Sequence, residues 1–272
     1  MSKVHSIADP SYVNRQYRDA SHLNARIRLH QQFSTNQYGW QRWLFDQFKL
    51  TSPSRILELG CGPGDLWLEN SDRIPAGSEV ILSDLSPGMV AQARHNLREG
   101  HFPLQFMLID AQSIPFAKGS FDLVIASHML YHVPDRARAL SEIRRLLKPA
   151  GCFFASTIGH DHLKELKDLV ARFDPQLNAW GSLPADSFTL ENGAAQLEAC
   201  FAEVALHRYP DALLVTDASL LSDYIASGRL ELTPGQRKDL AAFVEQALAA
   251  SAGRLKITKD SGLFEARNTR QP

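Results

Sequence analysis

Cysteine is scarce in this sequence, and long apolar runs are missing from it. The three cysteines, Cys61, Cys152 and Cys200, lie far apart, which excludes a disulfide framework and the paired spacing of a zinc site. No window approaches the roughly 20 apolar residues of a membrane span. Residues 1–10 lack the apolar core of a signal peptide. We therefore expect a soluble, cytoplasmic protein without a membrane span.

An excess of charge of either sign is also missing. The chain has 29 Lys and Arg residues against 30 Asp and Glu residues, so its net charge is −1. Such a balance provides no global field to attract nucleic acid or an anionic membrane, and we expect no nucleic-acid partner. Hydrophobic residues make up 44% of the 272 residues, enough for the sizeable core of one α/β domain with insertions.

The most informative stretch is an apolar run that leads directly into closely spaced glycines. Residues 56–59 are mostly apolar, as expected of a strand buried on both faces of a parallel sheet. Gly60, Gly62 and Gly64 then permit a sharp turn and expose bare main chain to a ligand. Residues 65–69 can begin a helix whose free N–H groups face that ligand. This combination predicts the nucleotide-binding corner of an open α/β sheet.

The glycine spacing distinguishes between ligands. A dinucleotide site would follow G-x-G-x-x-G, whereas this loop reads G-x-G-x-G and is preceded by Glu58. Taken alone, the loop also fits a tight turn in any α/β protein. The pattern E-x-G-x-G-x-G resembles the first motif of class I methyltransferases that use S-adenosylmethionine.

A second buried strand is expected at residues 79–84, and it ends in Asp84. Asp84 follows Gly60 by 24 residues, close to the interval of about 20 at which an acid meets the ribose hydroxyls in such folds. Both oxygens of one carboxylate can accept hydrogen bonds from neighbouring hydroxyls. The alternative role is to cap the next helix, but Ser86 and Pro87 already provide an N-cap and a first-turn proline.

Residues 105–110 repeat this design as a third strand that ends in Asp110, followed by Ala111 and Gln112. The Asp-Ala pair resembles the adenine site of the methyltransferases, where the carboxylate accepts from the exocyclic amine and the next N–H faces the ring. Ligands bind at the carboxyl ends of parallel strands in open α/β sheets. We therefore expect the glycine loop and both acids to share one crevice.

The block from residue 121 to residue 151 carries the most specific resemblance. It reads as a fourth strand, a His-rich loop and an amphipathic helix, and it is similar to small-molecule methyltransferases of the ubiquinone and menaquinone biosynthesis type. The resemblance covers residues 55–160. It implies an α/β fold with a Rossmann-like, seven-stranded, mostly parallel sheet, an antiparallel last strand, helices on both faces and helical lid insertions. It also implies S-adenosylmethionine as cofactor, S-adenosylhomocysteine as product and a small-molecule substrate.

The resemblance and the strand ends together predict the site residues. Those expected to bind the cofactor are Glu58, Gly60, Cys61, Gly62, Gly64, Asp84, Leu85, Met89, Asp110, Ala111, Gln112 and Ser127. Met89 fits simple core packing equally well.

Methyl transfer from a sulfonium releases a neutral thioether, so the enzyme mainly aligns the reactants and excludes water. If a base assists, the candidates are His128, Tyr131 and His132, because they follow the fourth strand and a histidine titrates near neutral pH. His132 also reads as a structural tie of the loop, and His128 reads equally as base or bystander. No cluster of acids or asparagines follows the strand, so we expect no metal.

The rest of the chain predicts an organisation of cap, domain and lid. We expect an N-terminal helical cap over 1–50 and a methyltransferase domain over 51–272. Helical insertions at about 160–201 and 217–252 would roof the substrate pocket. The remaining strands are expected at 203–209 and 262–267, the second of them antiparallel at the sheet edge.

The N-terminal part has two interpretations. Trp40 and Trp43 either pack a helix on the sheet or belong to a lid in which Tyr12, Tyr17 or Arg18 touches ligand.

The sequence favours methyl transfer from S-adenosylmethionine to a small molecule by in-line displacement. Two other classes stay open. One is a non-catalytic S-adenosylmethionine-binding sensor or partner subunit, which a cavity plugged by residues 160–201 would support. The other is an NAD-dependent oxidoreductase, which the glycine spacing disfavours.

Overall fold

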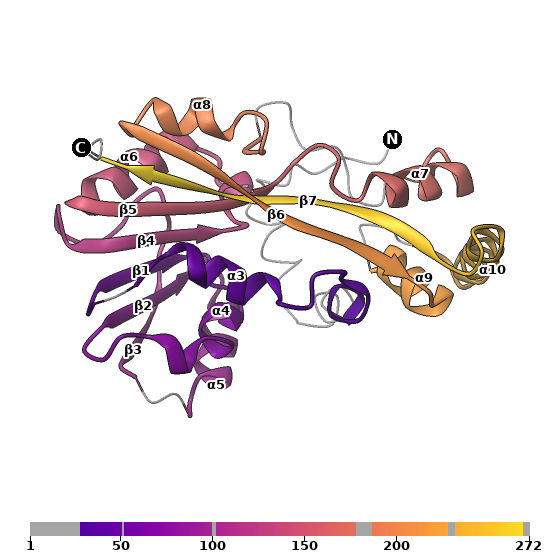
Figure 1. Ribbon diagram of the computed structural model, residues 1–272, viewed down its shortest axis with the longest axis horizontal. Coiled ribbons are helices and arrows are strands. Elements are labelled where there is room, and N and C mark those ends of the chain that lie inside the picture. The colour runs from indigo at the N-terminus through magenta and orange to yellow at the C-terminus, as the bar shows by residue number, and fades with distance from the viewer. Residues whose placement is uncertain (1–27, 51, 100–101, 178–186, 228–231, 269–272) are drawn as a thin grey trace.

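A computed structural model describes residues 28–50, 52–99, 102–177, 187–227 and 232–268. Its centre is one seven-stranded sheet with the strand order β3-β2-β1-β4-β5-β7-β6 (Figure 1). The strands are β1 Arg55–Leu59, β2 Glu79–Asp84, β3 Leu104–Leu108, β4 Phe121–Ser127, β5 Leu147–Ile158, β6 Glu203–Val215 and β7 Leu255–Arg267. Strands β1 to β5 pair in parallel, which confirms the predicted mostly parallel sheet.

The last strand, β7, is antiparallel to both of its neighbours, as predicted. Its predicted position at the sheet edge is wrong, because β7 lies between β5 and β6, and β6 forms the edge. Both strands are also longer than predicted, at 13 residues each. Pro210 interrupts the apolar pattern of β6, and an edge strand tolerates proline because one row of its N–H groups needs no partner.

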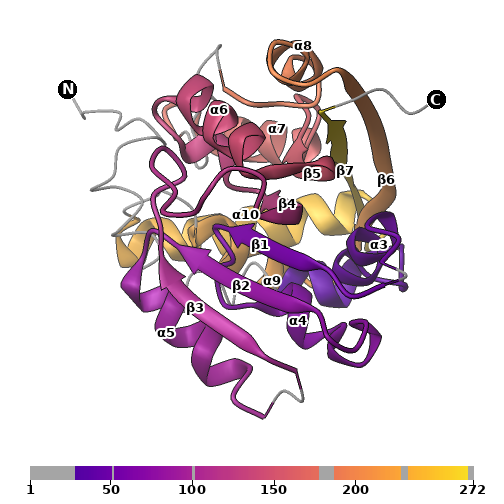
Figure 2. The same cartoon turned by 90° about the vertical axis from the view of Figure 1, so that its left-hand side faces the viewer.

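Helices cover both faces of the sheet, as predicted (Figure 2). The helices on one face are α3 Trp40–Gln47, α4 Asp65–Leu68 and α5 Pro87–Asn96. Those on the other are α6 Arg136–Leu146 and α8 Gly193–Glu198. Leu57 and Val124 contribute to the core of the α6 face, whereas Ile56 and Leu123 contribute to the core of the α3 face. This alternation is the two-residue period of strands that are buried on both sides.

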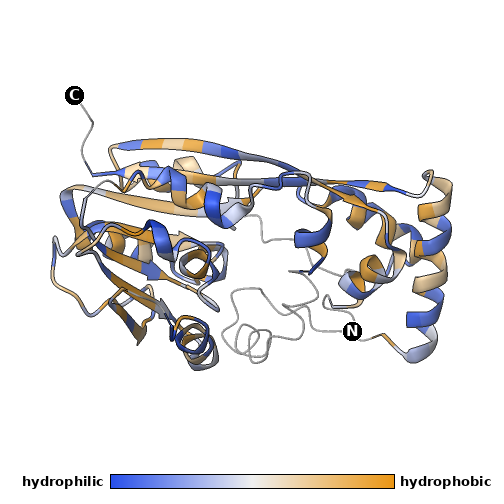
Figure 3. Cartoon of the chain, turned by 60° about the horizontal axis from the view of Figure 1, so that its bottom comes forward, coloured by the Kyte–Doolittle hydropathy of each residue, from blue (hydrophilic) through white to orange (hydrophobic). Residues whose placement is uncertain are grey.

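A second hydrophobic cluster lies beyond the carboxyl end of β5. It joins the helices α7 Lys164–Phe173, α9 Ala218–Ala226 and α10 Pro234–Ala250 to the end of β6 and the start of β7. Figure 3 shows this helical group connected to the sheet by the two long strands. The predicted insertion at 160–201 divides, because α7 belongs to this group while α8 packs on the sheet.

The N-terminal cap is described only in part. Residues 28–33 are helical, Ser34 forms a bridge with Leu213 of β6, and α3 packs on the sheet. Tyr12, Tyr17 and Arg18 lie outside the described residues. Of the helices that the structure describes, none combines the length and the hydropathy needed to cross a lipid bilayer.

Candidate active site

One cavity of about 1150 Å³ opens at the carboxyl ends of the parallel strands. It brings together, from five separate segments, every site residue that the sequence predicts except Gly64. The predicted residues that line it are Glu58, Gly60, Cys61, Gly62, Asp84, Leu85, Met89, Asp110, Ala111, Gln112, Ser127, His128, Tyr131 and His132. The crevice expected from the strand ends is therefore present.

The three glycines of the loop differ in what they permit. All three have positive φ, at 69° for Gly60, 53° for Gly62 and 84° for Gly64. A Cβ atom at Gly62 would meet nothing within 4 Å, so the backbone there is bare toward the cavity. A Cβ atom at Gly64 would lie 2.7 Å from Cδ1 of Leu97 in the α5 packing. Gly62 thus leaves space for a ligand, and Gly64 permits close packing.

Asp84 holds the loop and the next helix together. Its Oδ2 accepts from the Gly62 N–H at 3.0 Å and its Oδ1 accepts from the Ser86 N–H at 2.8 Å. Burial raises the pKa of this carboxyl, while the two backbone hydrogen bonds oppose that rise. Ser86 caps α5 with its hydroxyl, as predicted, so Asp84 is not needed as the side-chain cap. Each carboxylate oxygen keeps a lone pair for a ligand hydroxyl.

Asp110 lies in the turn that follows β3 and is exposed. Its carboxylate accepts from the backbone N–H of Gln112 at 2.9 Å and from the Gln112 amide at 3.0 and 3.2 Å. Ala111 is buried beside it. The turn therefore presents a carboxylate, a small apolar side chain and an amide to the cavity, a suitable edge for a polar heterocycle.

Glu58 is buried, with 2% of its surface exposed, and it accepts a hydrogen bond from the Trp67 indole N–H at 2.6 Å. This bond joins β1 to α4 across the glycine loop. Burial raises the pKa of Glu58 from 4.5 to about 7, against the opposing effect of the indole hydrogen bond. One oxygen of Glu58 thus supports the loop, although the residue also contributes to the cavity wall.

Four other predicted cofactor residues or candidate bases surround these groups. Met89 is buried, while Leu85 leaves 52% of its surface exposed. Tyr131 and His132 lie in the short 3₁₀ helix η2 Leu130–His132, with their rings 4.6 Å apart. The His132 N–H donates to the carbonyl of Met129 at 2.9 Å. This backbone bond is compatible with the structural interpretation of His132.

His128 has a constrained backbone. Its φ is 52°, an uncommon value for a side chain of this size. Its N–H donates to the Ser156 carbonyl at 3.2 Å and to the Ser156 hydroxyl at 3.0 Å, and that hydroxyl also lies 2.9 Å from the Ser127 hydroxyl. Burial, with a smaller contribution from the charge of Lys259, lowers the pKa of His128 to about 4. The imidazole is therefore neutral at physiological pH.

An aromatic group that the sequence did not predict as site residues stands beside His128. Trp40 lies 5.1 Å from the His128 ring and 5.2 Å from the Tyr209 ring, measured between centroids. Trp43 lies 5.1 Å from Tyr209 in the same way. Trp40 and Tyr209 line the cavity, so α3 both packs on the sheet and reaches the site. The register that places β6 here is a tertiary feature, and no local signal indicates it.

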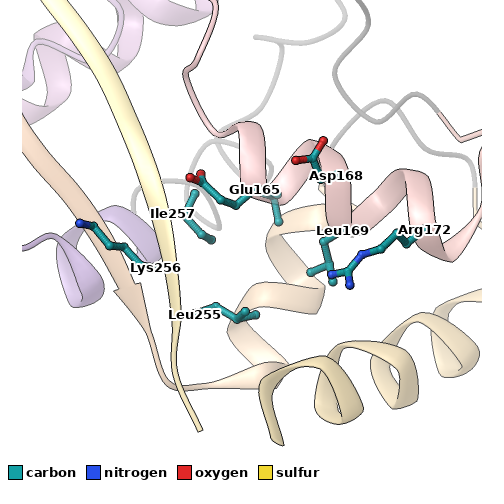
Figure 4. Close-up of a pocket in the computed structure, with 8 residues that line it drawn as sticks. Glu165, Asp168, Leu169, Arg172, Leu255, Lys256 and Ile257 are labelled. Atoms are coloured by element: carbon teal, nitrogen blue, oxygen red, sulfur yellow. The ribbon is translucent and has the colours of Figure 1, made fainter. Parts of the chain in front are cut away.

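A second cavity, of about 400 Å³, lies between α7 and the start of β7 (Figure 4). The Glu165 carboxylate on its wall accepts from the N–H of Thr258 at 2.8 Å and from the Thr258 hydroxyl at 2.7 Å. These bonds fasten α7 to β7. Within the described part of the chain, none of the predicted site residues lines this cavity.

Comparison with known proteins agrees with the geometry. Residues 57–155 match a family model described as a methyltransferase domain. Demethylmenaquinone methyltransferase of Thermus thermophilus is 37% identical over 112 residues, which are 41% of this chain and 50% of that protein. Malonyl-[acyl-carrier protein] O-methyltransferase of Legionella pneumophila is 36% identical over 124 residues, 44% of this chain and 42% of that protein. The chain thus spans about half the length of the curated relatives it matches.

A solved structure extends the likeness of fold beyond this block. The [4+2]-cyclase SpnF superposes with a TM-score of 0.60 at 17% identity, over 99% of this chain and all of that one. At this identity the likeness concerns the fold alone. The sequence match, the glycine loop and the acids at the strand ends agree on one family. Residues 57–155 belong to a class I S-adenosylmethionine-dependent methyltransferase domain.

Proposed function

We propose that this protein transfers a methyl group from S-adenosylmethionine to a small-molecule acceptor. The observation that carries the proposal is the gathering of the bare backbone at Gly62, the carboxylate of Asp84 and the polar turn at Asp110 on one cavity wall. Together they provide surfaces for a nucleoside with vicinal hydroxyls and a polar base. The match of residues 57–155 to the methyltransferase domain supports the same ligand.

The size of the cavity supports a second ligand. Pockets for one small ligand span roughly 300–1,000 Å³. The present cavity, at about 1150 Å³, exceeds that range and continues past the glycine loop to Trp40 and Tyr209. We assign this continuation to the acceptor. It also argues against the sensor hypothesis, because from the region 160–201 only His162 is among the lining residues and no described helix fills the space.

The proposed roles of the residues follow from what each contacts. When bound, S-adenosylmethionine supplies a methyl group on a sulfonium, and its departure as a neutral thioether needs no acid. The Gly62 backbone and Asp84 would hold the nucleoside, and Asp110 with Gln112 would face the base. His128, held by Ser156, would orient the acceptor and receive its proton. A conjugate acid with a pKa of about 4 retains a proton poorly at neutral pH, so positioning dominates over base catalysis.

The N-terminal segment and the distal helices complete the proposal. We assign the capping role to residues 1–50 and the selection of acceptor to α7, α9 and α10, because this part of the chain lies outside the matched block. The helix α8 packs on the sheet and is not included.

The decisive experiment is methyl transfer from labelled S-adenosylmethionine into a cell extract of small metabolites. We expect label in a small molecule with the wild-type protein and none with Asp84→Ala. Binding of S-adenosylmethionine without transfer would favour the sensor hypothesis instead. Label in protein or nucleic acid would contradict the proposed acceptor class.

A further inference from the structure

The wall of the cavity formed by β6 and β7 holds a group of polar side chains on one face of the sheet. Tyr209 pairs with Ser261 and Asp211 pairs with Lys259 across the two antiparallel strands. Residues two apart on a strand point to the same side, so all four share one face. Three of them, Tyr209, Lys259 and Ser261, line the cavity.

Tyr209 contributes a hydroxyl that lacks a partner. The residue leaves only 3% of its surface exposed, and among the described residues its hydroxyl oxygen has no hydrogen-bond partner. Trp40 and Trp43 pack against its ring and hold it in place. A buried hydroxyl without a partner is costly, by about 1–3 kcal/mol, unless a ligand satisfies it. This hydroxyl therefore indicates a ligand group that accepts or donates a hydrogen bond.

Lys259 adds a positive charge beside that hydroxyl. Its ammonium lies 5.6 Å from the centroid of the Tyr209 ring and forms an ion pair with Asp211. The Asp211 carboxylate also accepts from the hydroxyls of Ser34 and Thr35 and from the N–H of Asn36, at 2.7 to 3.1 Å. Because neutral donors already satisfy Asp211, the ammonium, which has three donors, keeps protons for a ligand.

The charges around the cavity restrict the ligand. The acids that line it, which are Glu58, Asp65, Glu69, Asp84 and Asp110, lie on β1, on α4 or at the ends of β2 and β3. The lining residues from segments 127–134, 158–162, 209 and 259–261 include histidines and Lys259 but no acid. A cationic acceptor would find no counter-ion there, whereas an anion would find an ammonium and a hydroxyl.

The position of these residues separates them from the nucleoside. In the sheet order, β4 and β5 lie between β1, which carries the glycine loop, and β7. Three strand spacings of about 4.8 Å amount to roughly 14 Å. Tyr209 nevertheless approaches His128 through Trp40, which contacts both rings. A group bound at Lys259 would thus leave the rest of the acceptor beside His128.

From this arrangement we propose that Tyr209 and Lys259 form a subsite for a carboxylate or phosphate group of the methyl acceptor. Asp211 acts as a positioning residue that fixes Lys259. The inference rests on the proposed function and narrows its substrate class to acidic small molecules.

The test measures binding of simple anions to the full chain, alone and saturated with S-adenosylhomocysteine. Benzoate and phenyl phosphate are the probes, and benzamide is the neutral control, with affinities obtained by ligand-observed NMR titration. We expect both anions to bind at least about tenfold more tightly than benzamide, in line with a charge-assisted hydrogen bond. Lys259→Met and Tyr209→Phe should each lower the anion affinity several-fold and leave benzamide unchanged.

Matched variants keep the outcome interpretable. Lys256→Met removes an exposed lysine of the same strand that lies outside this cavity (Figure 4), and it should change no affinity. Tyr209→Phe removes a hydroxyl without a partner and should not lower the unfolding midpoint, so its effect on anions cannot be attributed to misfolding.

Two results would overturn the proposal. One is equal affinity of the wild type for the anions and for benzamide. The other is a loss of S-adenosylhomocysteine affinity in Lys259→Met with unchanged affinity for 5′-methylthioadenosine, because the anion bound there would then be the carboxylate of the cofactor. Failure of the wild type to bind S-adenosylhomocysteine would instead contradict the proposed function.

Discussion

The Asp84 carboxylate accepts a hydrogen bond from the backbone N–H of Gly62 at 3.0 Å, so the acid at the end of β2 fixes the glycine loop that follows β1. The same carboxylate accepts from the Ser86 N–H at the start of α5. One side chain therefore fixes two backbone segments and still has lone pairs that face the cavity.

Asp84→Ala should lower the affinity for S-adenosylhomocysteine at least about tenfold, because it removes a ligand contact and releases the loop. Asp84→Asn keeps the shape of the side chain and one acceptor oxygen, so it should lose less. Isothermal calorimetry measures both variants. Equal affinities of Asp84→Ala and wild type would remove Asp84 from the nucleoside site.

Gly62→Ala and Gly64→Ala form a matched pair that separates a ligand contact from a packing contact. Both place alanine at positive φ, which costs about 1–2 kcal/mol. The new methyl group at residue 62 enters the cavity and should lower cofactor affinity about tenfold. At residue 64 it meets Cδ1 of Leu97, so the free energy of unfolding should fall by a further ~1–3 kcal/mol with affinity nearly kept. Denaturant titration and calorimetry measure the two quantities.

The stability of Glu58→Gln should depend on pH in a defined direction. Burial raises the pKa of Glu58 from 4.5 to about 7, so the folded state binds a proton that the unfolded state has already lost between these values. The wild type therefore loses stability as pH rises through this window. The glutamine stays neutral and its oxygen can still accept from Trp67. We expect equal stabilities near pH 4 and a gain of about 3 kcal/mol for the variant at pH 8.

Urea titrations of wild type and Glu58→Gln at pH 4, 6 and 8 measure this difference. A stability difference that does not change with pH would show that Glu58 titrates normally, and the burial argument would fail.

His128→Ala should lower kcat roughly 10²-fold, the lower end of the range for a positioned base, while affinity for S-adenosylhomocysteine stays within about twofold. Because the pKa of His128 is lowered to about 4, its imidazole is already neutral above pH 5. The wild-type kcat should therefore not fall through protonation of this group between pH 8 and pH 6. An unchanged kcat in the variant would exclude His128 from the mechanism.

The part of the fold that sequence predicts best is the part that local signals determine. The run from Glu58 to Gly64 combines an apolar strand with glycines that occupy positive φ, and its meaning does not depend on distant contacts. Ser86 and Pro87 mark the start of α5 in the same local way. The acids at strand ends meet because parallel strands bring their carboxyl ends to one edge.

Features fixed by tertiary contacts were missed. Tyr209 reaches the cavity only because β6 pairs with β7 in one register, and neither strand shows this in its own pattern. Pro210 makes β6 read as a strand that ends at residue 209, although it continues to Val215. The insertion of β7 between β5 and β6 depends on a return of the chain from α10, which hydrophobic periodicity does not encode.

The most direct test of the central claim is calorimetric titration of the full chain with S-adenosylhomocysteine and, separately, with NAD. The account predicts saturable binding of S-adenosylhomocysteine at one site per chain and no heat with NAD. Binding of NAD, or no binding of S-adenosylhomocysteine, would contradict it.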